Sequence, residues 1–153
     1  DILRYILYEG SDKRVSLDKE IKYLRSYAEL EKVRHGDRVN LSLKIEGDIE
    51  TQEIVPMLLI PFVENSFKHG FGRDMANGYV NIHIQVNQDE LILELKNSKP
   101  SVGMELKNTE NYQGGIGLQN VNRRLKLMYP DKHSMEVVET DLEYKVNLKI
   151  NLA

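Results

Sequence analysis

Residues 114–129 read GGIGLQNVNRRLKLMY and place three glycines directly before a helical pattern. The apolar residues of that pattern recur at spacings of three, four and three, at Leu118, Val121, Leu125 and Met128. This period predicts an amphipathic helix, which Tyr129-Pro130 ends. Glycines allow close approach of a backbone to a ligand, and the free N–H groups of a helix start attract anions. The stretch is therefore either a phosphate site or a simple turn.

The composition is that of one globular domain. The chain has 153 residues, 41% of them hydrophobic, and a net charge of −3, so no basic field indicates binding to nucleic acid. It has no cysteine, which excludes disulfides and thiolate metal sites. Its longest apolar run, residues 54–63, is too short to span a bilayer. Because the chain opens on Asp1 and DILRYILY already has a helical pattern, we expect it to be part of a longer protein.

The first third of the chain is predicted to hold two helices and a strand. Residues 1–9 look like the end of a helix that Gly10 stops. Ser16 is a plausible N-cap for a helix running to about residue 35, with Glu20 in the first turn, where a carboxylate suits the helix dipole. Alternating apolar residues then predict a strand over residues 39–45. The apolar stripe of the helix is formed by Leu17, Ile21, Leu24 and Ala28.

The remaining pattern mixes hairpins with helices. A helix is predicted from Pro56 to Gly70. Further strands are predicted over residues 79–86, 91–97, 135–139 and 144–150, and a long polar loop over residues 98–115. Each strand is apolar on one face only, so helices should cover one side of the sheet. The sequence predicts an α+β fold, a two-layer α/β sandwich with a mixed sheet.

The helix PMLLIPFVENSFKHG, residues 56–70, has a polar face that admits two interpretations. Asn65, Lys68 and His69 lie away from its apolar side. A solvated surface is the simpler interpretation. The alternative is a ligand face, because Mg²⁺ takes few protein ligands and a single amide oxygen beside a lysine suits a metal-bound phosphate.

Asn97 is a polar residue in an apolar register. It continues the inward series of Leu91, Leu93 and Leu95 at the end of a strand. A buried side-chain amide needs hydrogen-bond partners. Asn97 bonds either to the local backbone or to the edge of a buried ligand.

The order of these features resembles the Bergerat-type (GHKL) ATP-binding domain of gyrases, heat-shock chaperones, histidine kinases and MutL proteins. IPFVENSFKHG (60–70) and GGIGLQNVNRRLKLMYP (114–130) are similar to LytS/YehU-type sensor histidine kinases. Residues 16–39 resemble the linker helix that precedes the ATP domain of those kinases. The resemblance implies that residues 1–36 end the dimerisation and linker helices. Residues 37–153 would be the ATP-binding catalytic domain, with a lid at about 98–114.

The resemblance also implies a nucleotide site for ATP and Mg²⁺. It assigns Mg²⁺ coordination to Asn65 and adenine recognition to Asn97. The positions expected at the phosphates are Lys68, His69, Gly115, Ile116, Gly117 and Leu118. The glycine-rich stretch would then be a phosphate cradle and not a simple turn.

Two departures from the family pattern qualify these expectations. The adenine motif, normally Asp-x-Gly-x-Gly, reads here as Asn97, Ser98 and Lys99. An asparagine oxygen still accepts a hydrogen bond but carries no charge. In addition, the four histidines do not occur in the Asn-Pro-His-Phe-like context of the phospho-acceptor; they are His35, His69, His83 and His133. We therefore expect the acceptor histidine to lie outside this chain, which itself holds no catalytic residue.

The implied function is that of the catalytic part of a two-component sensor histidine kinase. It would transfer the γ-phosphoryl group of Mg-ATP to a histidine on its upstream dimerisation helices, and then to a response regulator of the LytTR type. The full-length protein would be a homodimer anchored in the membrane, with this domain in the cytoplasm. One alternative is a non-catalytic ATP-binding module. An ATP hydrolase is disfavoured, because Pro61 stands where such enzymes place their general base and Glu64 lies about 100° around the helix from Asn65.

Overall fold

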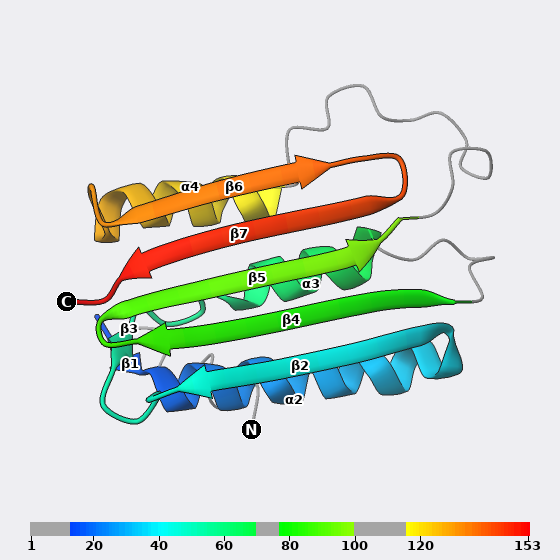
Figure 1. Cartoon of the computed structure of the whole chain (residues 1–153), viewed down its shortest axis with the longest axis horizontal. Coiled ribbons are helices and arrows are strands. Elements are labelled where there is room, and N and C mark those ends of the chain that lie inside the picture. Colours follow the sequence, from blue (N-terminus) through cyan, green and yellow to red (C-terminus); the bar gives the residue numbers. More distant parts are fainter. Residues whose placement is uncertain (1–12, 70–76, 100–115) are drawn as a thin grey trace.

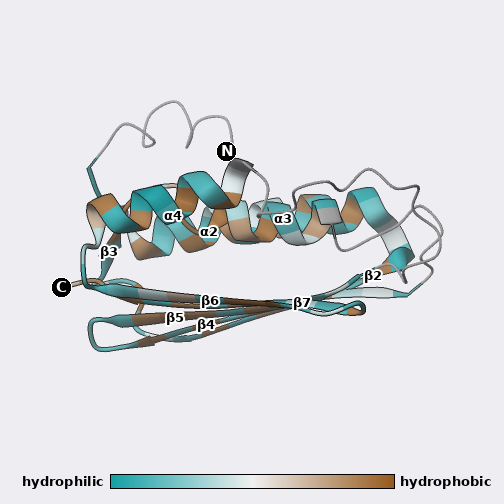
Figure 2. Ribbon diagram, turned by 90° about the horizontal axis from the view of Figure 1, so that it is seen from above, coloured by the Kyte–Doolittle hydropathy of each residue, from teal (hydrophilic) through white to brown (hydrophobic). Residues whose placement is uncertain are grey.

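The computed structural model describes residues 13–69, 77–99 and 116–153 and confirms the predicted two-layer α+β fold. Helices lie on one face of a twisted sheet, and the other face is open (Figures 1 and 2). The helical elements are α2 (Leu17–His35), the short 3-10 helix η1 (Gly36–Arg38), α3 (Ile60–His69) and α4 (Ile116–Met128). In Figure 1, α2 and α3 run in one direction and α4 runs in the other.

The main sheet is mixed, with the strand order β2-β4-β5-β7-β6. β2 pairs in parallel with β4, and the other neighbours are antiparallel. Its strands are β2 (Val39–Gly47), β4 (Gly78–Asn87), β5 (Glu90–Ser98), β6 (His133–Glu139) and β7 (Glu143–Asn151). A separate antiparallel pair, β1 (Val15–Ser16) and β3 (Glu53–Ile54), was not predicted, because two residues are too few to show a strand period.

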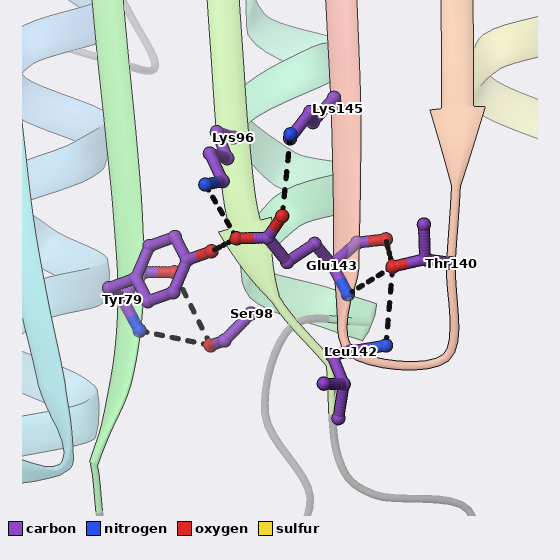
Figure 3. A network of polar contacts seen from close by, with 7 residues as sticks. All are labelled: Tyr79, Lys96, Ser98, Thr140, Leu142, Glu143 and Lys145. Atoms are coloured by element: carbon purple, nitrogen blue, oxygen red, sulfur yellow. Dashed lines mark hydrogen bonds and ion pairs between the residues drawn. The ribbon is translucent and has the colours of Figure 1, made fainter.

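The two faces of the sheet differ as the alternation predicted. Ile82, Leu93 and Leu148 are buried beneath the helices. The open face carries polar side chains, and Figure 3 shows one group of them around Glu143. This carboxylate accepts a hydrogen bond from the hydroxyl of Tyr79 and forms ion pairs with Lys96 and Lys145.

The ends of α2 agree with the sequence analysis. The Oγ of Ser16 accepts from the backbone N–H of Lys19 at 3.4 Å. Gly36 ends the helix with φ at 61°, a conformation that glycine adopts without steric cost. The buried residues of α2 belong to the same apolar core as those of α3 and the sheet.

Several details of the prediction were wrong. α3 begins at Ile60, because residues 56–59 form a turn in which Met57 has φ of 56°. Met128 is 43% exposed, and Tyr129, one residue later, is fully buried in its place. Strand β6 begins at His133, two residues before its predicted start at residue 135.

Some predictions fall outside the described residues. The helix predicted over residues 1–9 does so entirely, as does nearly all of the lid predicted at residues 98–114. Among the helices that are described, none combines the length and the apolar character needed to cross a membrane.

Candidate functional site

The predicted site residues gather at one end of the helical layer, which we call the site end. It comprises the C-terminal half of α3, the end of β5 at Asn97–Lys99, and the first turn of α4 at residues 116–118. In Figure 1 these three parts lie toward the right-hand side of their elements. α3 packs against α4, β5 and α2, so residues distant in sequence are carried by neighbouring elements.

Helix α3 presents Asn65 beside its buried face. Phe62, Val63 and Ser66 are fully buried, and the Oγ of Ser66 donates to the carbonyl of Phe62 at 3.0 Å. Asn65 is half-buried. At 3.6 residues per turn its side chain leaves the helix about 60° from those of Phe62 and Lys68, which lie on either side of it, and about 100° from that of Glu64. Asn65 is therefore available to a ligand that approaches this flank of α3.

Lys68 lies one turn after Asn65, on the side of α3 that faces α2. It lines a depression of about 290 Å³ together with α2 side chains that include Tyr27, Glu31 and His35. The ring of His35 stacks on Phe67 with centroids 5.9 Å apart. Burial, and then the charges of Glu31 and Glu64, raise the pKa of Tyr27. That Lys68 faces phosphate stays a prediction; its side chain is exposed and leaves α3 about 60° around the helix from that of Asn65.

Asn97 has an unusual hydrogen-bonding state. Its side chain is 1% exposed and lies on the helix side of the sheet, in register with Val80 and Tyr144. Its Nδ2 donates to the carbonyl of Ser98 at 2.9 Å. Its Oδ1 has no hydrogen-bond partner among the residues that the structure describes. The local interpretation thus holds for Nδ2, whereas contact of Oδ1 with a ligand stays a prediction.

The residues that replace the family's adenine motif after Asn97 have structural roles. The Oγ of Ser98 accepts from the backbone N–H of Tyr79 at 3.0 Å. The Nζ of Lys99 contacts Glu139 Oε1 at 2.6 Å and the carbonyl of Thr140 at 3.1 Å. These bonds connect the end of β5 to β4, to the end of β6 and to the β6–β7 turn.

The start of α4 combines an exposed backbone with a buried anchor. Gly117 is exposed, and a Cβ built there would meet nothing within 4 Å. The next residue, Leu118, is 8% exposed and joins the core. Ile116 begins the helix, while Gly115 precedes the described part. His69 ends α3, and its side chain is likewise not described.

The opposite end of the layer holds a group of residues that the sequence analysis missed. Glu20 was assigned to the helix dipole, but it is fully buried and accepts from the backbone N–H groups of Met57 and Leu59 at 2.9 and 3.0 Å. Arg124 of α4 donates to the carbonyls of the same turn. A signal existed in the sequence, because Glu20 lies three residues after Leu17 on the apolar stripe of α2, where a carboxylate needs partners.

In the described residues, no three His, Asp or Glu side chains are grouped as a metal site. A cation held by one protein amide, water and phosphate oxygens does not require such a group.

Comparison with known proteins finds similarity to sensor proteins and histidine kinases. A family model described as histidine kinase matches residues 1–39. The sensor protein LytS of Oceanobacillus iheyensis is 30% identical over 91% of this chain and 25% of its own length. The sensor histidine kinase BtsS of Escherichia coli is 27% identical over 89% of this chain and 24% of its own. The chain thus spans about a quarter of the length of these relatives.

Solved structures agree on the fold. The catalytic domain of the histidine kinase ThkA superposes with a TM-score of 0.59 at 16% identity, covering 91% of this chain and 94% of that domain. ThkA in complex with the response regulator protein TrrA gives a TM-score of 0.58 at 15% identity, covering 99% of this chain and 46% of that one. At such low identity these likenesses establish the fold alone.

Proposed function

We propose that this chain, a homologue of LytS- and BtsS-type sensor histidine kinases with the fold of a histidine kinase catalytic domain, binds Mg-ATP at its site end. It would present the γ-phosphoryl group to a histidine that lies outside residues 1–153. Because the chain spans about a quarter of its relatives' length, transfer to that histidine requires the longer protein.

The observation that carries this proposal is the buried Oδ1 of Asn97, which has no hydrogen-bond partner among residues 13–69, 77–99 and 116–153. A buried acceptor without a donor costs about 1–3 kcal/mol, and few native proteins retain one without a reason. The exocyclic amino group of adenine is a donor that would satisfy it. The acceptor lies at the end of β5, beside the helix α3 that carries Asn65.

The other site residues fit the phosphates and the metal. Asn65 would supply an amide oxygen to Mg²⁺, and the glycine at position 117 leaves the first turn of α4 open to a close approach by phosphate. Gly115, Ile116, His69 and Lys68 are proposed as neighbours of the phosphates on the resemblance alone. Bound Mg-ATP would supply the phosphoryl group, and the chain's own residues would contribute positioning and charge neutralisation.

Further parts of the proposal concern the whole protein. We propose residues 1–36 as the end of its dimerisation and linker helices and residues 37–153 as its catalytic domain. A response regulator, of the LytTR type by family resemblance, is the proposed partner; the ThkA–TrrA complex supports a regulator in general. We also propose that the full protein is a homodimer anchored in a membrane, with this domain on the cytoplasmic side.

A second candidate is a non-catalytic ATP-binding module. Asn97 in place of an aspartate removes a charge from the adenine site, and the side chains of Ser98 and Lys99 are engaged in the sheet. This arrangement favours modest affinity. The two candidates differ in phosphorylation of the longer protein, which only the kinase performs.

The binding test is calorimetric titration of the chain with a non-hydrolysable ATP analogue, with and without Mg²⁺. We expect Mg²⁺-dependent binding that Asn65→Ala removes, because the metal loses its protein ligand. Glu64→Ala, an exposed change on the same helix, is the matched control and should bind as the unmodified chain does. Absence of binding at millimolar nucleotide, or unchanged Mg²⁺-dependent binding by Asn65→Ala, would overturn this assignment.

A further inference from the structure

The turn before α3 is held at a single peptide group from two sides. The linkage between Pro56 and Met57 donates its N–H to Oε2 of Glu20 at 2.9 Å. Its carbonyl oxygen accepts from Nη2 of Arg124 at 2.7 Å. Glu20 belongs to α2 and Arg124 to α4, so one peptide joins these two helices. We call Glu20, this peptide and Arg124 the clamp.

Additional hydrogen bonds reinforce the clamp. Oε1 of Glu20 accepts from the N–H of Leu59 at 3.0 Å. Nη1 of Arg124 donates to the carbonyl of Met57 at 3.2 Å. The hydroxyl of Tyr129, just after α4, accepts from the N–H of Val55 at 3.0 Å. The turn is therefore bonded to α2 on one side and to the end of α4 on the other.

The opposite charges of Glu20 and Arg124 both polarise the peptide between Pro56 and Met57 in the same direction. A carboxylate at the N–H and a guanidinium at the carbonyl both polarise the peptide along its own dipole, and hydrogen bonds aligned in this way strengthen one another. Glu20 is fully buried, and its two carboxylate oxygens accept from the N–H groups of the turn. Removing Glu20 takes the acceptor from two backbone N–H groups, and removing Arg124 takes the donor from two backbone carbonyls.

The backbone conformation of the turn also depends on the clamp. Met57 has φ of 56°, in the left-handed region that residues with a Cβ rarely adopt. Such a conformation persists only where the surroundings over-determine it. Glu20 and Arg124 both bond to the peptide before Met57, and Arg124 also bonds to the carbonyl of Met57. These bonds hold Met57 in its rare conformation.

The clamp stands directly before the helix that carries Asn65. α3 begins at Ile60, one residue after Leu59, and α4 carries Gly117 two turns before Arg124. We infer that Glu20 and Arg124 are positioning residues that set the placement of α3 against α4 and couple it to α2. The consequence for nucleotide affinity rests on the proposed function, whereas the placement of the helices does not.

The direct test measures distances between helices without nucleotide. The chain has no cysteine, so spin labels can be placed at single introduced thiols. Glu64→Cys on α3, paired with Asn120→Cys on α4 or with Arg25→Cys on α2, uses exposed positions outside the clamp. We expect Arg124→Ala to shift or broaden the α3–α4 distance and Glu20→Gln to do the same for α2–α3.

Matched controls change charge on the same helices away from the turn. Lys126→Ala on α4 and Glu29→Gln on α2 are exposed and should leave both distances unchanged. Arg124→Lys retains the charge but not the two-pronged donor, so it should restore the distance only in part. Unchanged distances in Arg124→Ala and Glu20→Gln would overturn the inference, and so would shifts of equal size in the controls.

Two further measurements keep the inference testable if a single variant fails to fold. Stability of Glu20→Gln, Arg124→Lys and their double variant should be non-additive, because both changes release one peptide. Met57→Gly should reduce the effect of Glu20→Gln, since glycine adopts the left-handed region unaided. Additive losses, with no effect of Met57→Gly, would contradict the clamp.

Nucleotide binding supplies the functional readout. We expect about tenfold weaker binding in Arg124→Ala, the scale at which residues supporting a site act. If the unmodified chain binds no nucleotide, the proposed function fails while the distances still decide the clamp. If the chain binds and the distances shift but the affinity of Arg124→Ala equals that of Lys126→Ala, the link between clamp and site is wrong.

Discussion

The two ends of the helical layer differ in how their buried polar groups are hydrogen-bonded. At the clamp end, three N–H groups and two carbonyls between Val55 and Leu59 bond to side chains from α2 and from the end of α4. At the site end, the buried Oδ1 of Asn97 has no partner within the described part of the chain. Both ends are formed by the same three helices on the same sheet (Figure 1).

This difference distinguishes buried polar groups that stabilise the fold from those that can bind a ligand. Buried groups that bond within the fold stabilise it and restrict its geometry. A buried acceptor without a donor lowers the stability of the free protein and can be satisfied by a ligand. The clamp end therefore holds the helices in place, and the site end is where a partner molecule is expected.

The largest expected effect is on stability, and it comes from replacing a glycine at the clamp end. Gly47 closes β2 beside the clamp end with φ of 95°, and a Cβ there would lie 1.9 Å from the carbonyl oxygen of Val86. Gly47→Ala should therefore lower the free energy of unfolding by about 3 kcal/mol, through backbone strain and displacement. Urea denaturation followed by circular dichroism measures the change.

Gly117→Ala is the matched change at the site end, where the added Cβ meets open space. It should leave stability unchanged or raise it by up to about 1 kcal/mol, because alanine is the better helix former. Nucleotide binding should nevertheless weaken if phosphate binds as proposed, since the methyl group would stand in its path. Equal losses of stability in the two variants would remove the contrast between the ends.

The next effect concerns the available acceptor itself. Asn97→Leu should weaken binding of the ATP analogue by about ten- to a hundredfold, the scale of one buried hydrogen bond, without loss of stability. The change removes Oδ1, which has no partner among the described residues, and this gain offsets the loss of the Nδ2 bond to the carbonyl of Ser98. Calorimetric titration and thermal unfolding measure the two quantities.

Asn97→Asp should change both quantities in the opposite sense to Asn97→Leu. A buried carboxylate should destabilise the free chain and accept more strongly from an amino group. A variant that loses stability and gains affinity supports the assignment. Loss of stability by Asn97→Leu with unchanged affinity would instead identify Asn97 as a structural residue.

The smallest effect is expected on the open face beneath the site end (Figure 3). Hydrogen bonds from Lys96 first, and then Tyr79, lower the pKa of Glu143 from 4.5 to about 2. Because this pKa is lower in the folded state, the contribution of Glu143 to stability is complete above pH 4.5 and is lost as the pH falls toward 2.

Glu143→Gln should therefore flatten the acid side of the stability profile slightly. The group is partly exposed and screened by water, so the change should be small and should decrease further at high salt. Thermal unfolding between pH 5 and pH 2 measures it, with the exposed Glu136→Gln as control. Identical profiles for the two variants would show that the group in Figure 3 contributes no net stability.

Periodicity predicted most of the fold. Val80, Ile82 and Ile84 alternate because a pleated strand turns successive side chains to opposite faces, and this holds whatever the strand pairs with. The helix boundaries at Ser16 and Gly36 were also local, since caps satisfy backbone groups within one turn. The start of α3 was predicted wrongly at Pro56, because the turn there depends on Glu20, a residue more than thirty positions earlier.

The sequence by itself determined the main helices and the strands of the main sheet, the inward position of Asn97 and the motifs shared with sensor kinases, because these depend on local period and residue type. Only the tertiary structure decided that one oxygen of Asn97 lacks a donor among the described residues. It also decided that Glu20 and Arg124 hold one peptide from two sides. The physical reason is that hydrogen bonds join groups by distance and direction in space, which the order of residues along the chain does not encode locally.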